Sequence, residues 1–266
     1  MPDWWWAYLG LGAFVGFIAG LLGIGGGAAM VPVLAFIFAA KGFAPSQIVH
    51  LALGTAMTTI LFTSASSVYA HHRHRAILWP TVARMTPGVV AGTAGGALLA
   101  GVLSVRLLAI IFMLLITWSA SNMLFGKRSI ERTSRTDGTF KASAIAAAIG
   151  IISSLTATGG GSLVVTYLTA QGIRIQSAIA TAAAIGWPLA AAGASGYVIT
   201  GLQRQDLPTH SLGYVYLPAL GGIVVASMLF APLGARVAHR LPAKRLKQVF
   251  ALILLALAGK MLVDFF

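Results

Sequence analysis

The sequence predicts an all-α polytopic membrane protein made of two inverted repeats, each with one helix broken at a Gly-Gly-Gly motif. Three observations support this fold class. The 266-residue chain is 58% hydrophobic and only 9% charged, and apolar runs near or above about 18 residues recur along it, as in membrane-spanning helices. Two glycine triplets, at 25–27 and 159–161, interrupt such runs. The basic residues divide unequally between the two sides of the membrane, as described below.

Apolar segments are expected at 4–22, 28–40, 46–70, 77–100, 106–125, 142–158, 162–172, 176–200, 213–234 and 246–264. Segments 28–40 and 162–172 have 13 and 11 residues. At about 1.5 Å per residue, neither can cross a hydrocarbon core of about 30 Å. The longest polar connection is a linker rather than a domain. The predicted organisation is therefore a first transmembrane repeat at 1–125, a cytoplasmic linker at 126–141 and a second transmembrane repeat at 142–266.

The two halves of the chain match one another at fixed offsets. A shift of 134 residues places the first glycine triplet on the second. A shift of 138 gives an ungapped block in which Pro80 matches Pro218 and Gly96 matches Gly234. Apolar composition alone produces chance matches, so the triplets and the two prolines are the informative positions. The matches predict an internal duplication.

The basic residues indicate how the halves are oriented. If the chain passes straight through each glycine triplet, the two sides of the membrane hold nine and eight Lys or Arg residues, with no bias. If the chain reverses at each triplet, one side holds thirteen and the other four, namely Lys41, Arg106, Arg204 and Lys260. The second arrangement is the asymmetry of the positive-inside rule. It predicts inverted halves, a cytoplasmic linker and two external termini.

Other compositional features exclude several classes of protein. The N-terminal "MPDWWWAYLG" has no basic region typical of a secretory signal, and its Trp cluster is typical of an interfacial anchor. The chain contains no cysteine, which excludes disulfides and thiolate metal sites. The net charge of +13 resides in short loops between apolar spans, which does not favour nucleic acid. The expected partners are a small anionic substrate and the lipid bilayer, no cofactor is expected, and homo-oligomerisation stays open.

The glycine triplets suggest a site for an anion. Non-helical backbone at membrane depth is tolerated where it is buried in protein or lines a cavity. A short helix is expected to begin directly after each triplet, at Ala28 and Ser162, and the first N–H groups of a helix lack intrahelical partners and lie at its positive end. Such ends bind anions. The candidate substrate-binding residues are therefore Gly25, Gly26, Gly27, Ala28, Thr158, Gly159, Gly160, Gly161 and Ser162, with Thr156 as a further hydroxyl donor.

An alternative interpretation is that the glycines only permit close helix packing, as small residues do in membranes. Two triplets at matching positions of a duplicated chain favour the anion site. The halves are not identical, because the first offers Gly23, Ile24 and Ala28 where the second offers hydroxyls, and Thr166 stands where Pro32 stands.

Three stretches, "GIGGGAAMVPVL", "HLALGTAM" and "ATGGGSLVVTYLTAQG", resemble the TauE/SafE family, also called the sulfite exporter or TSUP permease family. The resemblance covers almost the whole chain, from Leu11 to about Leu262. It implies a duplicated membrane transporter that moves sulfite, sulfonates or other sulfur-containing anions, often outward. The residues alone indicate an anion, without specifying sulfur.

Three further residues are candidates for the substrate site. Arg84 lies about 10 Å into the 77–100 span, where a cation is either functional or extends to the lipid headgroups. His50 opens the "HLALGT" stretch, and it either carries protons or is a hydrogen-bonded residue at a helix end. Thr55 follows on the same span, and one threonine of the set Thr55, Thr58 and Thr59 is expected to line the cavity.

The sequence does not favour an enzyme or a metal site. All five carboxylates, Asp3, Glu131, Asp137, Asp206 and Asp264, lie at termini or in loops, so acid–base chemistry within the membrane lacks its usual groups. The stretch "HHRHR" at 71–75 is contiguous and basic, which is typical of a cytoplasmic topology anchor rather than a metal site. A passive anion channel built on the same paired helix ends stays open.

Overall fold

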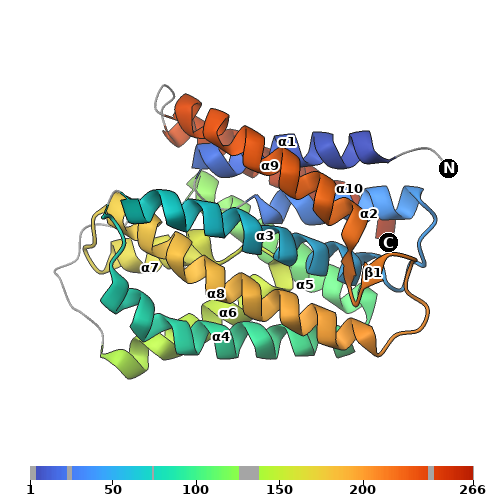
Figure 1. The fold of residues 1–266 in the computed structure, drawn as a ribbon, viewed down its shortest axis with the longest axis horizontal. Helices are drawn as coiled ribbons and strands as arrows, with labels where there is room; N and C mark the ends of the chain where they lie inside the picture. Colours follow the sequence, from blue (N-terminus) through green and yellow to red (C-terminus); the bar gives the residue numbers. More distant parts are fainter. Residues whose placement is uncertain (1–3, 23–25, 74, 126–137, 239–242, 266) are drawn as a thin grey trace.

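The computed structural model describes residues 4–22, 26–73, 75–125, 138–238 and 243–265. Within these residues the chain forms ten helices and one short hairpin (Figure 1). The elements in chain order are α1 (Trp5–Leu22), α2 (Gly27–Ala40), α3 (Ile48–Arg73), α4 (Trp79–Val102), α5 (Val105–Phe125), α6 (Thr139–Thr156), α7 (Gly161–Ala170), α8 (Ile175–Leu202), β1 (Ser211–Leu212), β2 (Val215–Tyr216), α9 (Leu217–Ala238) and α10 (Ala243–Phe265).

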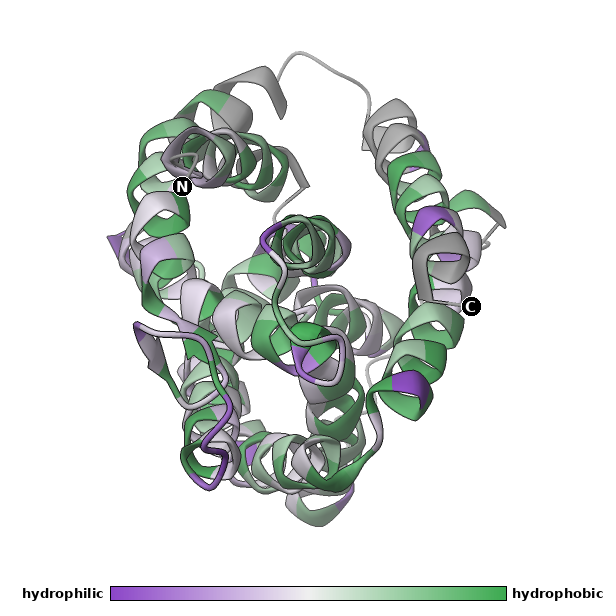
Figure 2. Cartoon of the chain, turned by 90° about the vertical axis from the view of Figure 1, so that its right-hand side faces the viewer, coloured by the Kyte–Doolittle hydropathy of each residue, from purple (hydrophilic) through white to green (hydrophobic). Residues whose placement is uncertain are grey.

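The fold class predicted from composition, an all-α polytopic membrane protein, is confirmed. Among the described residues, five helices are long and apolar enough to cross a membrane: α3, α4, residues 105–122 of α5, α6 and α8. Figure 2 views the bundle from the end that carries both termini and shows apolar residues along the helices and hydrophilic residues in the loops. The segment predicted at 213–234 begins later than expected, because residues 211–216 form the β1–β2 hairpin and α9 starts at Leu217.

The chain reverses direction between α1 and α2 and again between α6 and α7. The end of α2 lies beside the start of α1, since the Lys41 ammonium is 5.8 Å from the ring of Tyr8. The end of α7 lies beside the start of α6, since Gln171 and Ala142 line one cavity. The 14 residues of α2 and the 10 residues of α7 span about 21 and 15 Å, so each crosses only part of the bilayer.

Each of the main helix contacts has a counterpart formed by the corresponding helices of the other half of the chain. α1 packs against α9, and α6 packs against α4. The contact of α4 with α8 corresponds in the same way to that of α9 with α3. α3 contacts α8, and α5 contacts α10, so these helices pack on their own counterparts. Exchanging each of the first five helices with the helix five places later in the chain turns this set of contacts into itself. This is the pattern that two equivalent halves would produce.

Small residues allow the closest of these helix contacts. On α1, Gly12 and Gly16 lie against the backbone of Ile223 and Ser227 on α9. On α4, Gly88 and Gly92 lie in the same way against Ser143 and Ala147 on α6. In each case a Cβ atom would overlap backbone atoms of the neighbouring helix. Small residues four apart let membrane helices approach closely, because there is little hydrophobic gain in replacing lipid by another apolar helix.

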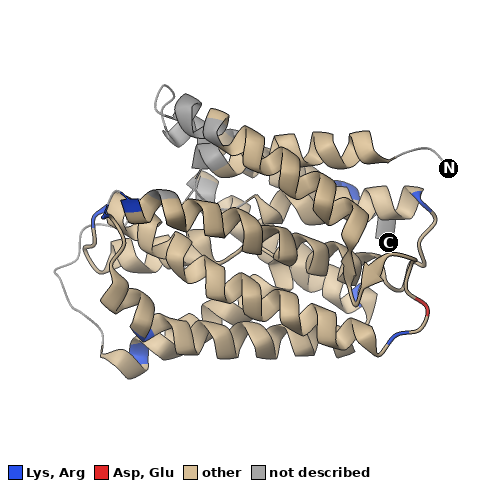
Figure 3. Cartoon of the chain, in the orientation of Figure 1, with Lys and Arg blue, Asp and Glu red and all other residues tan. Residues whose placement is uncertain are grey.

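The charged residues that the structure describes lie toward the two ends of the bundle (Figure 3). Lys41, Arg106 and Arg204 follow or open helices at the end where both termini lie. At the opposite end Arg73 closes α3, Lys141 lies in the first turn of α6 and Arg174 precedes α8. Most of the basic residues of the linker and of 236–247 fall where no side chains are described, so the thirteen-to-four asymmetry itself stays a prediction.

Candidate functional site

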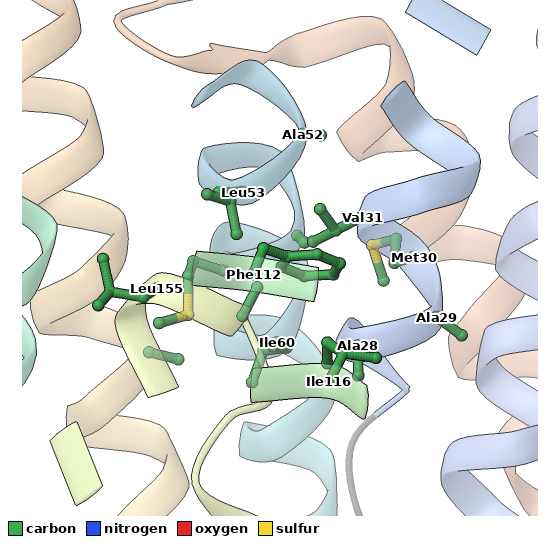
Figure 4. Packing of buried hydrophobic residues seen from close by; sticks show 14 of the residues in the cluster. Ala28, Ala29, Met30, Val31, Ala52, Leu53, Ile60, Phe112, Ile116 and Leu155 are labelled. Carbon is green, nitrogen blue, oxygen red and sulfur yellow. The ribbon is translucent and has the colours of Figure 1, made fainter. Parts of the chain in front are cut away.

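The two glycine segments meet inside the bundle. Gly27 is the first residue of α2, and a Cβ atom built on it would overlap the carbonyl oxygen of Ala157 and lie 2.6 Å from Cδ1 of Ile60 on α3. A Cβ atom built on Gly159 would lie 3.1 Å from Cγ2 of the same Ile60. Figure 4 shows Ile60 pointing toward the start of α2, where Ala28 lies. The backbones at the two breaks are therefore packed on one another and on α3.

This meeting point lies halfway along the central helices. Ile60 is the thirteenth of the 26 residues of α3. A Cβ atom added to Gly186 of α8 would lie 3.3 Å from the carbonyl oxygen of Gly159, and one added to Gly160 would lie 2.6 Å from Cδ1 of Leu189, also on α8. Gly186 and Leu189 are the twelfth and fifteenth of the 28 residues of α8. The glycine segments therefore lie near the middle of α3 and α8, which are both candidate membrane spans.

The two breaks use glycine for different reasons. In the second break Ala157, Gly159 and Gly160 have φ angles of 47°, 67° and 69°, the left-handed region that glycine adopts without strain. In the first break Gly26 has an ordinary φ of −62°, and its lack of a side chain instead admits Val15 of α1, whose Cγ1 would be 2.6 Å from a Cβ atom. Gly25 lies outside the described residues.

Both short helices begin at the meeting point, and their first N–H groups donate to no acceptor among the described residues. The first intrahelical bond of α2 runs from Met30 N–H to Gly26 O at 3.3 Å, and that of α7 runs from Val164 N–H to Gly160 O at 2.9 Å. The N–H groups of residues 27–29 and 161–163 precede those bonds. Both N-caps are glycines, so no described side chain caps either helix. Two positive helix ends with free donors therefore lie at the same depth, from which α2 and α7 run in opposite directions (Figure 1).

Hydroxyl groups lie beside the start of α7. Thr156 and Thr158 are buried, with their Oγ1 atoms 3.1 Å apart, and the Thr156 hydroxyl donates to Ile152 O at 2.8 Å. With Ser162 they border a depression of about 240 Å³ between α5, α6 and α7, which also includes Ser119. These hydroxyls and the helix end offer hydrogen-bond donors and acceptors without a formal charge.

One hydroxyl at the site was not predicted from the sequence. Ser153 is fully buried, and its Oγ has no hydrogen-bond partner among the described residues. It lies 3.4 Å from a Cβ atom built on Gly160, the N-cap of α7. A buried polar atom without a partner is costly, so this atom supports a ligand or a water beside the helix end. Its position seven residues before Gly160 carries no local signal, because the reversal that brings the two together is a tertiary feature.

The structure places His50 and Thr55 away from the glycine segments. His50 lies near the start of α3, where its Nε2 is 2.9 Å from Ala100 O and its ring stacks on Tyr214 at 4.9 Å. Thr55 is buried, and its Oγ1 accepts a hydrogen bond of 3.0 Å from the N–H of Tyr216. Both residues thus hold the hairpin region rather than the helix ends of the candidate site.

Arg84 lies near the other end of the bundle. It is exposed and lines a cavity that is open to solvent, together with Thr81, Tyr167 and Gln171. On α4, Arg84 precedes Ala100, the partner of His50, by sixteen residues, or about 24 Å. His50 and Arg84 therefore lie toward opposite ends, with the glycine segments between them. Among the described residues no group of three His, Asp or Glu side chains is arranged to hold a metal ion.

The polytopic helical fold, with two interrupted helices that meet at mid-depth, is that of a membrane transporter, and the comparisons with known proteins agree. The chain belongs to the sulfite exporter TauE/SafE family, whose model matches residues 8–261. It is 34% identical over 251 residues to a "Probable membrane transporter protein" of Haemophilus influenzae, covering 94% of this chain and 95% of that protein.

Two further relatives have the same general description. The "Probable membrane transporter protein YunE" of Bacillus subtilis is 30% identical over 175 residues, covering 58% of this chain and 63% of that protein. A probable membrane transporter protein of Methanocaldococcus jannaschii is 23% identical over 247 residues, covering 92% and 90%. No solved structure matches the chain.

Proposed function

We propose that this membrane transporter carries a small anion, which binds between the N-termini of α2 and α7. The contact of Gly27 with Ala157 carries the proposal, because it brings two uncapped helix ends together at mid-depth. Backbone N–H groups at helix ends favour negative charge. The unpartnered Ser153 hydroxyl and the hydroxyls of Thr158 and Ser162 add hydrogen-bonding groups on the side of α7.

The substrate class that we propose is a small sulfur-containing anion, such as sulfite or a short organosulfonate. The family description supports sulfite. Physical support comes from the size of the site: Gly27, Gly159 and Gly160 are in close contact with neighbouring atoms, so a bulky ligand would require the halves to separate. The anion's oxygens would accept from backbone N–H groups and hydroxyls, and cations or neutral solutes would lack this complementarity.

The proposed mechanism is alternating access by two equivalent halves, 1–125 and 142–266, in the cell membrane. The exchange of helix partners between the halves supports the duplication, and the two reversals make each half cross the membrane an odd number of times. We place the linker in the cytoplasm and both termini outside. The basic residues at the linker side would concentrate anions there, which favours export. Rocking of one half against the other around the glycine segments would expose the site to each side in turn.

A ligand screen followed by flux measurement tests the proposal. Purified protein is heated with sulfite, sulfate, thiosulfate, taurine, sulfoacetate or chloride, and the anions that raise the melting temperature are then tested for flux in proteoliposomes. We expect stabilisation by sulfite or a short sulfonate, and flux that saturates and shows counter-exchange. Non-saturating flux would favour the alternative of an anion channel. Stabilisation by a neutral or cationic solute, and by none of these anions, would contradict the anion site.

A further inference from the structure

The β1–β2 hairpin lies between the glycine segments and the end of the bundle that carries both termini. It contacts α3, α8 and α9. On α3 its contact residue Thr55 is five residues, or about 8 Å, from Ile60. On α8 its contact residue Tyr197 is eight residues, or about 12 Å, from Leu189. Ile60 and Leu189 both contact the glycine segments, so the hairpin lies about two turns along the central helices from the proposed site.

Two hydrogen bonds, a ring stack and close backbone packing hold the hairpin in this position. The N–H of Tyr216 donates to Thr55 Oγ1 at 3.0 Å, and the N–H of Tyr214 donates to the backbone carbonyl of Tyr197 at 3.2 Å. The ring of Tyr214 stacks on His50. The backbone of Tyr214 fits closely against Gly54 of α3, where a Cβ atom would overlap its carbonyl oxygen. These contacts fill the space between α3 and α8 at this end.

The packing around the hairpin leaves buried polar atoms without partners. Among the described residues, six buried side-chain N or O atoms lack a hydrogen bond, and five of them belong to residues at this end: Tyr8 OH, Gln47 Nε2, Gln47 Oε1, His50 Nδ1 and Ser211 Oγ. Tyr8 lies edge-on to Tyr216, whose ring is 5.2 Å from the Lys41 ammonium. Native proteins pair nearly all such atoms. Three of these residues belong to the hairpin or contact it, namely Ser211, His50 and Tyr8, so an outward movement of the hairpin would let water satisfy their polar atoms.

We propose that the hairpin at 211–216 is the outer gate of the transport path, shown here closed. This inference rests on the proposed transport function. Thr55 and His50 are positioning residues that hold the gate and do not bind substrate. When the hairpin moves outward, water reaches the unpaired atoms of Tyr8, His50 and Ser211, and the path from the glycine segments opens at this end.

Tyr197 connects the gate to the site. Its backbone carbonyl accepts the bond from Tyr214, and its hydroxyl donates to Ser154 O on α6 at 2.9 Å. Ser154 is next to Ser153, whose unpartnered hydroxyl lies beside the N-cap of α7. A ligand that shifts this part of α6 would therefore act on the same residue that holds the hairpin.

The natural absence of cysteine makes a labelling experiment straightforward. Ser211→Cys places a thiol where the Oγ is buried in the closed hairpin. Ser104→Cys is the exposed reference, at the α4–α5 connection near the same end, and Ser227→Cys is the buried reference, on α9. Each variant, reconstituted in nanodiscs without ligand, is treated with a membrane-impermeant maleimide and the labelling rate is measured. Nanodiscs expose both faces, so the result does not depend on topology.

We expect Ser211→Cys to react more slowly than Ser104→Cys and faster than Ser227→Cys. Adding Thr55→Val removes the acceptor for Tyr216 N–H and should raise the rate at Ser211→Cys on the order of tenfold. The matched control is Thr59→Val, one turn further along α3, because the Thr59 hydroxyl bonds only within its helix, to Thr55 O at 2.9 Å. It should leave the rate unchanged.

Two results would overturn the gate. One is labelling of Ser211→Cys at the rate of Ser227→Cys in every background, Thr55→Val included, since the hairpin would then never expose Ser211. The other is an equal effect of Thr55→Val and Thr59→Val, which would reflect general loosening. The labelling needs no substrate, so a failure to find a transported anion leaves this test intact, and a static hairpin leaves the anion site intact.

Discussion

The backbone of Gly27 lies so close to the carbonyl oxygen of Ala157 that no side chain fits between them. The two residues are 130 positions apart in the sequence and lie in different halves of the chain. Their contact joins the start of α2 to the reversal before α7.

Gly27→Ala should separate the two glycine segments. The added methyl group meets the Ala157 carbonyl and Ile60, so we expect a loss of stability of at least about 2 kcal/mol and loss of transport. The matched control is Gly95→Ala on α4, where a Cβ atom meets nothing within 4 Å. Melting curves and flux of both variants would be compared. Wild-type flux in Gly27→Ala would show that the contact is unimportant for transport.

Gly160 and Gly186 separate folding effects from binding effects. Gly160→Val requires a β-branched residue at a φ of +69° and places its Cβ 2.6 Å from Leu189, so we expect it to destabilise the fold as well as binding. Gly186→Ala instead adds a methyl 3.3 Å from the Gly159 carbonyl within a regular helix, where alanine is favoured over glycine by about 1 kcal/mol. It should keep its melting temperature and lose anion-dependent stabilisation. Unchanged anion affinity in a folded Gly186→Ala would place the anion elsewhere.

The reversals predict the position of the chain ends relative to the membrane. In the structure α1 begins and α10 ends at the same end of the bundle, opposite the end of α5 and the start of α6 (Figure 1). A reporter fused after Phe266 should therefore be external, and one inserted at Thr136 should be cytoplasmic. Alkaline phosphatase and green fluorescent protein fusions would report the two sides, and a cytoplasmic C-terminus would contradict the inverted arrangement.

Transport should not depend on sodium. A sodium site within a membrane normally uses a carboxylate or several carbonyl oxygens, and none of the five carboxylates in the sequence lies in the middle of a described helix. Of these, Asp206 is exposed in the connection after α8 and Asp264 lies in the last turn of α10. Flux into proteoliposomes should be equal in sodium and potassium buffers. A strict requirement for sodium would count against an anion site made only of backbone N–H groups and hydroxyls.

Arg84 should affect capture of the substrate more than its translocation. Its cavity includes Gln171, which is eleven residues, or about 16 Å along α7, from Gly160. At that distance a charge attracts an anion without contacting it in the central site. We expect Arg84→Gln to raise the KM for flux from the linker side several-fold with little change in the maximal rate. The control is Arg73→Gln, in the last turn of α3, which should raise the KM by a smaller factor. Equal effects of the two variants would assign Arg84 a general surface role.

The sequence alone predicted the spans and their interruptions. Hydrophobic length and glycine runs are local properties, so the helix ends at Leu22 and Thr156 and the restarts at Gly27 and Gly161 fall within one or two residues of the expected bounds. The hydroxyls of Thr158 and Ser162 were likewise identified, because they are adjacent to the second triplet. The reason for glycine at the first break was not visible in the sequence. Gly26 has an ordinary φ of −62°, and the constraint there is a neighbouring helix, which local sequence does not show.

Only the tertiary structure decided which distant residues share a site. Contacts between residues that are far apart in the chain depend on how whole helices pack, and no local pattern encodes them. Packing brought Gly27 to Ala157 and left Ser153 buried without a partner beside Gly160. Packing also placed His50 and Thr55 against the hairpin instead of the glycine segments. The local composition of this chain thus determined where its helices break, and the packing of its central helices determined what those breaks face.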